Sequence, residues 1–232
     1  MYIDALAKLG VGGSHPGGLS LSKELLESQT IHAQTEILDV GCGTGLTSVY
    51  LYTHFNCRVT ACDKHLLMIK KANQRFQLAD VPVHATYEIA ESLSYQEEIF
   101  DFVLSESVTA FTNISKSLAE YYRVLKQGGK FIAIEMSHDE TLDETELKKM
   151  EHFYGIKNIR TRSEWVEDLK ANGFLNIKVQ PFHVDKLQTN SEYDFNPSPE
   201  LGPEIYDTIV EHEDLMSIYR SNIVPLILTA EK

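Results

Sequence analysis

The residues best suited to chemistry lie in a glycine-rich loop that reads Asp-x-Gly-x-Gly-x-Gly. Its members are Asp39, Gly41, Cys42, Gly43, Thr44 and Gly45. Glycines let the backbone turn tightly and approach a ligand closely, and the free N–H groups of a following helix favour an anionic group. The apolar residues Ile37, Leu38 and Val40 predict a buried strand over 37–40, and residues 46–54 predict a helix after the loop. We therefore expect the loop to hold a ligand at the end of a strand.

The spacing of the glycines separates this loop from two other nucleotide-binding loops. A dinucleotide-binding loop reads Gly-x-Gly-x-x-Gly, and Leu46 stands where its third glycine would be. A phosphate-binding loop of the Walker type requires Gly-Lys followed by Ser or Thr, and no such sequence follows here. An NAD-dependent oxidoreductase is therefore a disfavoured alternative, also because Asp39 lies inside the motif.

A second acidic residue, Asp63, follows the next predicted strand, residues 58–62, about twenty residues beyond the glycine loop. A carboxylate at this place can accept hydrogen bonds from both hydroxyls of a ribose. It can also cap the helix that we expect to start at Lys64. The two roles are compatible, and we expect ribose binding.

Strands and helices alternate along most of the chain. The predicted strands are 37–40, 58–62, 83–87, 100–105, 130–135, 174–181 and 223–229. The predicted helices are 20–29, capped by Ser20 or Ser22, 46–54, 64–77, 115–125, ended by Gly128 and Gly129, 138–151, 163–172 and 204–220. The pattern predicts an α/β fold with a doubly wound, mostly parallel seven-stranded sheet.

The composition narrows the compartment and the partners. The net charge is −13 and the densest basic patches, 148–149 and 157–162, are flanked by acids, which argues against a nucleic-acid partner. No apolar stretch approaches the length of a membrane span, and the N-terminus does not resemble a signal peptide. The three cysteines are odd in number and lack zinc-ligand spacing, so we expect a cytoplasmic protein without a metal site.

The motif that begins at Asp39 resembles motif I of the class I S-adenosylmethionine (SAM)-dependent methyltransferases, and among them the small-molecule enzymes of ubiquinone and menaquinone biosynthesis. Residues 100–106 resemble motif IV of that family, and residues 123–130 resemble the helix-to-strand turn that follows it. The resemblance covers residues 36–135 well and residues 160–181 more weakly. It implies a Rossmann-like fold, SAM as the methyl donor and S-adenosylhomocysteine (SAH) as the product. No set of His, Asp and Glu residues stands out as a metal site, so we expect no metal.

The resemblance also assigns roles to the residues of the cofactor site. The loop amides suit the carboxylate of SAM, Asp39 suits its ammonium group, and Asp63 suits its ribose. Ile89 replaces the acidic residue that related enzymes place near the adenine amino group, so the backbone at Ala90, or Glu88 or Glu91, would serve there. Met68 either lies against the adenine or packs in the core. The expected cofactor-binding residues are Asp39, Gly41, Cys42, Gly43, Asp63, Lys64, Met68, Ala90, Glu91 and Glu106.

Methyl transfer depends mainly on alignment and on exclusion of water, and a base is needed only where the acceptor loses a proton. Glu106 is the first candidate for such a base, because a strand delivers it to the ligand end of the sheet, and His138 is the second. His15 lies in the stretch Gly-Gly-Ser-His-Pro-Gly-Gly at 12–18. That stretch is either a bendable cover that turns His15 toward the acceptor or the amino-acid end of SAM, or a loop that only links two helices.

The acceptor is expected to be a small organic molecule that is methylated on O, N or C. No Asn/Asp-Pro-Pro-Tyr/Phe sequence follows the fourth strand, and no Pro-Cys dipeptide occurs, so the known patterns for DNA methylation are missing. A non-catalytic SAM- or SAH-binding protein is the alternative. We expect one methyltransferase domain over 1–232, with an N-terminal lid or helix at 1–30, a SAM-binding core at 36–135, a helical insertion at 136–160 and a lid or substrate segment at 182–222.

Overall fold

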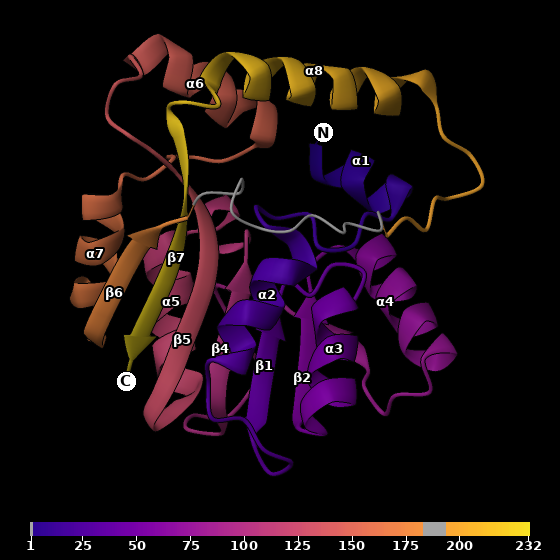
Figure 1. Ribbon diagram of the computed structural model, residues 1–232, viewed down its shortest axis with the longest axis vertical. Coiled ribbons are helices and arrows are strands. Elements are labelled where there is room, and N and C mark those ends of the chain that lie inside the picture. Colours follow the sequence, from indigo (N-terminus) through magenta and orange to yellow (C-terminus); the bar gives the residue numbers. More distant parts are fainter. Residues whose placement is uncertain (1, 183–193) are drawn as a thin grey trace.

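Seven strands form one sheet in the computed structural model, which describes residues 2–182 and 194–232 (Figure 1). The strand order is β3-β2-β1-β4-β5-β7-β6, in which β1 to β5 pair in parallel and β7 runs antiparallel to both β5 and β6. The strands are β1 Glu36–Val40, β2 Arg58–Asp63, β3 Ala85–Tyr87, β4 Phe100–Glu106, β5 Leu125–His138, β6 Leu175–Pro181 and β7 Ile223–Glu231. The predicted mostly parallel, seven-stranded α/β sheet is confirmed.

Helices cover both faces of the sheet. Helices α2, α3 and α4 pack on one face through buried side chains such as Leu26, Leu51 and Phe76, and helices α5 and α7 pack on the other through Leu118 and Trp165. The bounds are α2 Gly18–Glu27, α3 Leu46–Phe55, α4 Leu66–Leu78, α5 Ile114–Val124 and α7 Arg162–Ala171. Because β1, β2 and β4 are parallel neighbours, their carboxyl ends meet at one edge of this sandwich.

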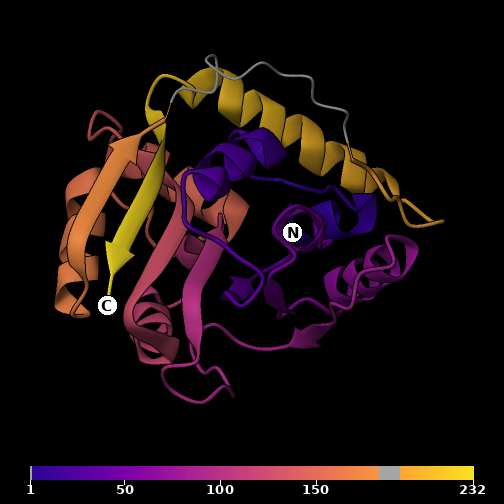
Figure 2. The ribbon, with the colours of Figure 1, turned by 60° about the horizontal axis from the view of Figure 1, so that its bottom comes forward.

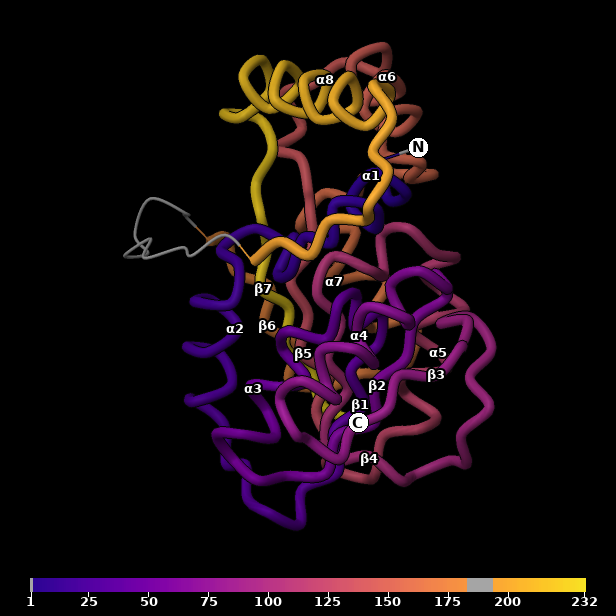
Figure 3. Tube along the Cα trace, turned by 90° about the vertical axis from the view of Figure 1, so that its right-hand side faces the viewer, coloured from indigo at the N-terminus to yellow at the C-terminus, as the bar shows by residue number. Residues whose placement is uncertain are grey.

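A third layer lies beyond the carboxyl ends of the parallel strands (Figures 1 and 3). It consists of α1 Tyr2–Leu9, α6 Glu144–Tyr154 and α8 Pro203–Tyr219. Tyr2 holds these helices together, since its ring lies 5.0 Å from the ring of Tyr154 and 5.0 Å from that of His212. Figure 2 shows the long α8 running beside the N-terminal segment. The sequence pattern did not define α1 as a separate helix.

Two predicted helix ends differ from the structure. Helix α5 ends at Val124, before the glycines that were expected to end it, and Gly128 and Gly129 lie inside β5. The reason is long-range pairing: Gly128 N–H donates to the carbonyl of Lys232 and Lys232 N–H donates to that of Gly129. Helix α2 begins at Gly18, so Ser20 and Ser22 lie within the helix and cap nothing.

The segments after β5 are more buried than their sequence suggests. The stretch 138–151 was expected to be a helix, but α6 starts only at Glu144, and it buries Met150 and Tyr154 in the main core. Within the segment 182–222, the stretch 183–193 lies outside the described residues. The residues from 194 to 202 are irregular and lead into α8. In the described part of the chain, no helix has the length and apolar character that a membrane span requires.

Candidate cofactor and active site

The glycine loop connects β1 to α3 and contains one position that is open on its ligand side. Gly41, Gly43 and Gly45 all have positive φ angles, of 68°, 55° and 80°. A Cβ atom added at Gly41 would collide with Val108, and one added at Gly45 would lie 2.6 Å from Phe76. A Cβ added at Gly43 would meet no atom within 4 Å. Packing therefore requires glycine at positions 41 and 45, whereas open space lies next to Gly43 in the middle of the loop.

Asp63 is fixed beside this open position. Gly43 N–H donates to Asp63 Oδ2 at 2.9 Å, and His65 N–H donates to Asp63 Oδ1 at 2.8 Å. The carboxylate is buried, and burial raises its pKa above the usual range. A carboxylate has about four lone-pair positions, so two remain for the hydroxyls of a ribose. The helix was expected to start at Lys64, directly after Asp63. Helix α4 begins at Leu66 instead, so Lys64 and His65 separate it from Asp63.

Asp39, at the end of β1, is buried and accepts a hydrogen bond from the hydroxyl of Ser48 at 2.5 Å. Burial, reinforced by the negative charge of Glu106 and then of Asp63, raises the pKa of Asp39 to about 7. The carboxyl groups at the ends of β2 and β4 thus both act on Asp39 near the end of β1. Such a group of acids favours a ligand that carries positive charge.

Glu106, the last residue of β4, is held by side chains from two helices. The hydroxyl of Ser22 in α2 donates to Oε1 at 2.5 Å, and the hydroxyl of Thr47 in α3 donates to Oε2 at 2.7 Å. The side chain of Glu106 is 9% exposed. Its orientation is therefore fixed next to the glycine loop, because Thr47 belongs to the first turn after that loop.

The structure brings His15 to the same place. Its Nε2 lies 3.5 Å from Glu106 Oε2 and 3.3 Å from the hydroxyl of Ser22, while its Nδ1 lies 3.2 Å from the carbonyl oxygen of Pro16. The side chain is 3% exposed. Both ring nitrogens therefore face oxygen atoms, and His15 and Glu106, which were predicted separately, form one buried acid–histidine contact.

His138 lies apart from this contact. Glu106 pairs with Ile134 in the β4–β5 register, so His138 is four residues further along β5, or roughly 13 Å at the usual rise of a strand. Its Nδ1 accepts a hydrogen bond from Glu140 N–H at 3.2 Å. His138 serves the turn after β5, and the structure does not group it with Glu106.

The remaining predicted cofactor residues lie in varied surroundings. Met68 is buried against Leu6 and Ala7 of α1, which agrees with a packing role. Lys64 is exposed between β2 and α4. Cys42 lies in the loop itself, where burial, followed by the nearby acids, raises the pKa of its thiol.

The segment after β3 contains the residues expected near the adenine. Ala90 is buried, Ile89 is 41% exposed, and the two lie in a short turn closed by an Ile89–Ser92 bridge. Glu91 accepts a hydrogen bond from Asn113 N–H at 2.9 Å, which ties this turn to the start of α5. Glu88 is occupied by the backbone and hydroxyl of Ser94.

Sequence reasoning missed Glu135, a fully buried carboxyl group of β5. It accepts hydrogen bonds from Thr109 N–H at 2.9 Å and Ala110 N–H at 3.3 Å, so it holds the short helix η1 (Thr109–Phe111) that follows β4. The available signal was an acid at the end of an otherwise apolar strand, Phe131 to Ile134. Ser22 and Thr47 gave no such signal, because their partner Glu106 is distant in sequence.

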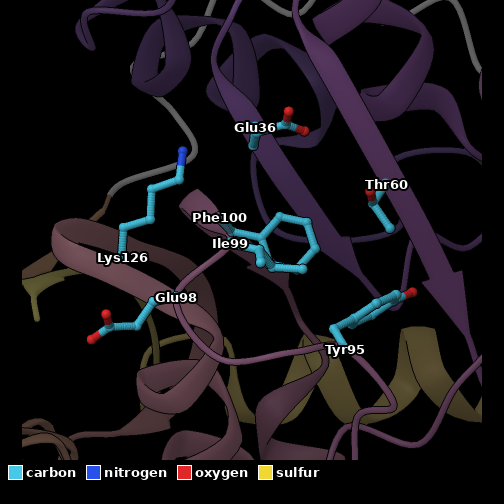
Figure 4. Close-up of a pocket in the computed structure, with 7 residues that line it drawn as sticks. All are labelled: Glu36, Thr60, Tyr95, Glu98, Ile99, Phe100 and Lys126. Carbon is cyan, nitrogen blue, oxygen red and sulfur yellow. The ribbon is translucent and has the colours of Figure 1, made fainter.

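A hollow of about 480 Å³ lies at the opposite edge of the sheet (Figure 4). Glu36, Thr60 and Phe100 line it near the amino ends of their strands. Its charged groups are already paired, since Glu36 binds Arg58 at 2.7 Å and Lys126 binds Asp101 at 2.9 Å. Because the hollow lies at the amino ends of the strands and the glycine loop lies at their carboxyl ends, the two are separate. No group of three potential metal ligands occurs among residues 2–182 and 194–232.

Comparisons with known proteins agree with this geometry. A family model described as a methyltransferase domain matches residues 38–133. The chain is 35% identical over 231 residues to the uncharacterized methyltransferase YodH of Bacillus subtilis (strain 168), and the match covers 100% of this chain and 99% of that protein. It is 32% identical over 121 residues to the ubiquinone/menaquinone biosynthesis C-methyltransferase UbiE of Zymomonas mobilis, covering 51% of this chain and 49% of that one.

The fold is also similar to a solved structure. Phosphoethanolamine N-methyltransferase 2 of Haemonchus contortus, in complex with S-adenosyl-L-methionine, superposes with a TM-score of 0.77 at 20% sequence identity. The match covers 94% of this chain and 53% of that chain, so the present chain spans about half the length of that enzyme.

Replacing Gly45 by alanine is expected to destabilise the fold more than replacing Gly155, which ends α6. Both glycines have positive φ, so each alanine carries a conformational cost of about 1–2 kcal/mol. Only at Gly45 would the Cβ press on Phe76, and such overpacking adds about 1–3 kcal/mol. Urea unfolding of the two variants measures the difference, and equal losses would contradict the packing role of Gly45.

The free energy of unfolding is expected to fall as pH rises from about 4.5 to about 7. Burial raises the pKa of Glu135 from 4.5 to about 7, so within this window the folded protein holds a proton that the unfolded chain has released. The contribution is on the order of 3 kcal/mol for a shift of this size. Urea unfolding between pH 4.5 and 8 should give a shallower fall for Glu135→Gln. Exposed Glu97→Gln is the control, and an unchanged slope in Glu135→Gln would contradict the assignment.

Proposed function

Because the chain belongs to the class I SAM-dependent methyltransferase family, we propose that it transfers the methyl group of SAM to a small organic acceptor that loses a proton, and that Glu106 receives this proton. The observation that carries the proposal is the buried contact of Glu106 with His15, next to the glycine loop. Bound SAM supplies an electrophilic methyl group on a positively charged sulfur atom.

The residues around the glycine loop fit this cofactor. The open side of Gly43 allows close approach of a ligand, and Asp63 has acceptor positions left for a ribose. Asp39, once ionised, would bind the ammonium group of the amino-acid end. Ala90 and the turn around it would border the adenine. The three carboxyl groups favour a cationic cofactor over the anionic pyrophosphate of a dinucleotide.

Glu106 and His15 would supply the proton chemistry. Transfer of a methyl group to an acceptor X–H forms the X–C bond, breaks the S–C bond, and leaves one proton to be removed. Ser22 and Thr47 hold the carboxylate of Glu106 in one orientation, as a general base requires. His15 would exclude water from one side of Glu106. Its Nε2, 3.5 Å from Oε2, could then take the proton from Glu106. An acceptor with a hydroxyl, an amine or an acidic C–H group would satisfy this chemistry.

The layer of α1, α6 and α8 supports a small acceptor. These helices lie over the carboxyl end of the sheet, the end at which β4 delivers Glu106. Of the proteins named above, one is described as a C-methyltransferase of ubiquinone and menaquinone biosynthesis and one as a phosphoethanolamine N-methyltransferase, and phosphoethanolamine is a small acceptor. The net charge of −13 disfavours a nucleic-acid acceptor.

Gly43→Val and Asp63→Ala are expected to abolish or strongly weaken SAH binding. The valine would fill the open side of the loop, and the alanine would remove the acceptor for the ribose. Isothermal titration with SAH and with NAD tests this, with Gly155→Val as the control because Gly155 also has positive φ and open space. Undiminished SAH binding in both variants, or tight binding of NAD, would overturn the cofactor site.

Glu106→Gln is expected to lower turnover by about 10²–10⁴-fold, the usual contribution of a general base. His15→Ala should lower turnover less, and His138→Ala should leave it unchanged because His138 lies apart from Glu106. The measurement is methylation with labelled SAM over a library of small hydroxyl, amine and carbon-acid compounds.

If a wild-type protein that binds SAH methylates nothing in that library, a non-catalytic SAM-binding role is favoured. If His15→Ala changes neither SAH affinity nor turnover, the stretch 12–18 is only a linker.

A further inference from the structure

Two segments that are far apart in the sequence pair with each other next to the glycine loop. Residues 8–12, which include the end of α1 and the turn after it, run antiparallel to residues 194–198, which precede α8, and we call this pair the strap. Gly12 N–H donates to the carbonyl of Asp194 at 2.9 Å, Asn196 N–H to that of Gly10 at 3.0 Å, and Ser198 N–H to that of Lys8 at 2.8 Å. Figure 3 shows the two segments converging beside α1.

The glycines of the first segment are needed for this approach. A Cβ atom at Gly10 would collide with the carbonyl of Asn196, and one at Gly12 would collide with the carboxylate of Asp194. The glycine-rich composition of the N-terminal stretch therefore permits tight pairing of two backbones at these positions.

Helix α4 holds the strap through two cationic side chains. Lys71 is buried and donates to the carbonyl of Lys8 at 2.9 Å and to that of Asn196, so it bridges both segments of the strap. Burial lowers the pKa of Lys71. One turn further along α4, Arg75 binds Asp194, with its Nη2 2.5 Å from Oδ2 and its Nη1 3.2 Å from Oδ1.

Arg75 also binds the glycine loop. Its Nε donates to the carbonyl of Thr44 at 2.7 Å, and its Nη2 lies 3.4 Å from the hydroxyl of the same residue. Thr44 stands between Gly43, which is open toward the ligand side, and Gly45, which is fixed by Phe76. One planar guanidinium therefore joins the loop that would hold the cofactor to the strap that passes beside it.

The strap leads directly to the acid–histidine contact. A Cβ atom at Gly12 would lie 3.2 Å from Leu46, the first residue of α3, so the strap touches the helix that follows the glycine loop. Three residues later, His15 lies against Glu106. Movement of the strap would therefore displace His15. Movement of Thr44 would displace the strap, because Arg75 binds both.

We propose that Arg75 is a positioning residue that couples cofactor binding in the glycine loop to ordering of the strap, and thereby to the placement of His15. This inference rests on the proposed function, because it takes SAM or SAH as the ligand of the loop. The fork of the guanidinium is the essential feature: a partly exposed ion pair contributes little stability by itself, whereas a planar donor with fixed geometry can hold two acceptors at once.

The test combines SAH titration with hydrogen–deuterium exchange of residues 8–12 and 194–198, each in the presence and absence of saturating SAH. In the wild type, SAH is expected to slow exchange in both segments of the strap. Arg75→Gln should weaken SAH binding about tenfold and abolish this SAH-dependent protection. Asp194→Asn keeps the bond from Arg75 to Thr44, so it should change SAH affinity less than about threefold while losing the protection.

Two further variants keep the result interpretable. Arg75→Lys retains a positive charge opposite Asp194 but lacks the fork, so it should also lose the protection, and it replaces Arg75→Gln if that variant does not fold. Arg58→Gln removes an exposed ion pair on β2 and should behave as the wild type. If the wild type binds SAH and the Arg75 variants keep both the affinity and the protection, the proposed coupling is wrong, while the proposed function is unaffected. If the wild type binds no SAH, the proposed function is overturned and the coupling falls with it.

Discussion

Three carboxyl groups meet where the parallel strands β1, β2 and β4 end, and the rest of the site depends on how their charge is balanced. Asp39, Asp63 and Glu106 are all at least nine-tenths buried. Burial of like charges is costly, and here each carboxyl group is bound by N–H or O–H donors from neighbouring elements. A ligand with a positive charge lowers the cost further, which is the physical reason why this fold suits a sulfonium cofactor.

The local part of this arrangement could be predicted from the sequence. The apolar strand, the glycine spacing and Asp63 form a pattern within about 25 residues, and such a pattern is set by strand, turn and helix geometry. Glu106 could also be identified, because a strand delivers its last residue to a known edge of the sheet. The parallel sheet itself followed from the alternation of strands and helices.

The contacts that complete the site could not be predicted in the same way. The contact between His15 and Glu106 joins residues 91 positions apart, and that between Arg75 and Asp194 joins residues 119 positions apart. No local propensity encodes such pairs. Ser22 illustrates the difficulty: the local pattern suggested a helix cap, whereas the tertiary fold turns its hydroxyl to Glu106. Gly128 likewise reads as a helix stop but serves pairing with the last residue of the chain.

We expect the cofactor to lie across Gly43 and Asp63, with its sulfur atom turned toward Glu106 and His15. A crystal structure with bound SAH is the sharpest test of this arrangement. Both ribose hydroxyls should bind Asp63, the amino group of SAH should lie near Asp39, and the space beyond the sulfur atom should open onto Glu106. SAH bound in the hollow around Glu36, or bound at the loop with its sulfur directed away from Glu106, would show that this arrangement is wrong.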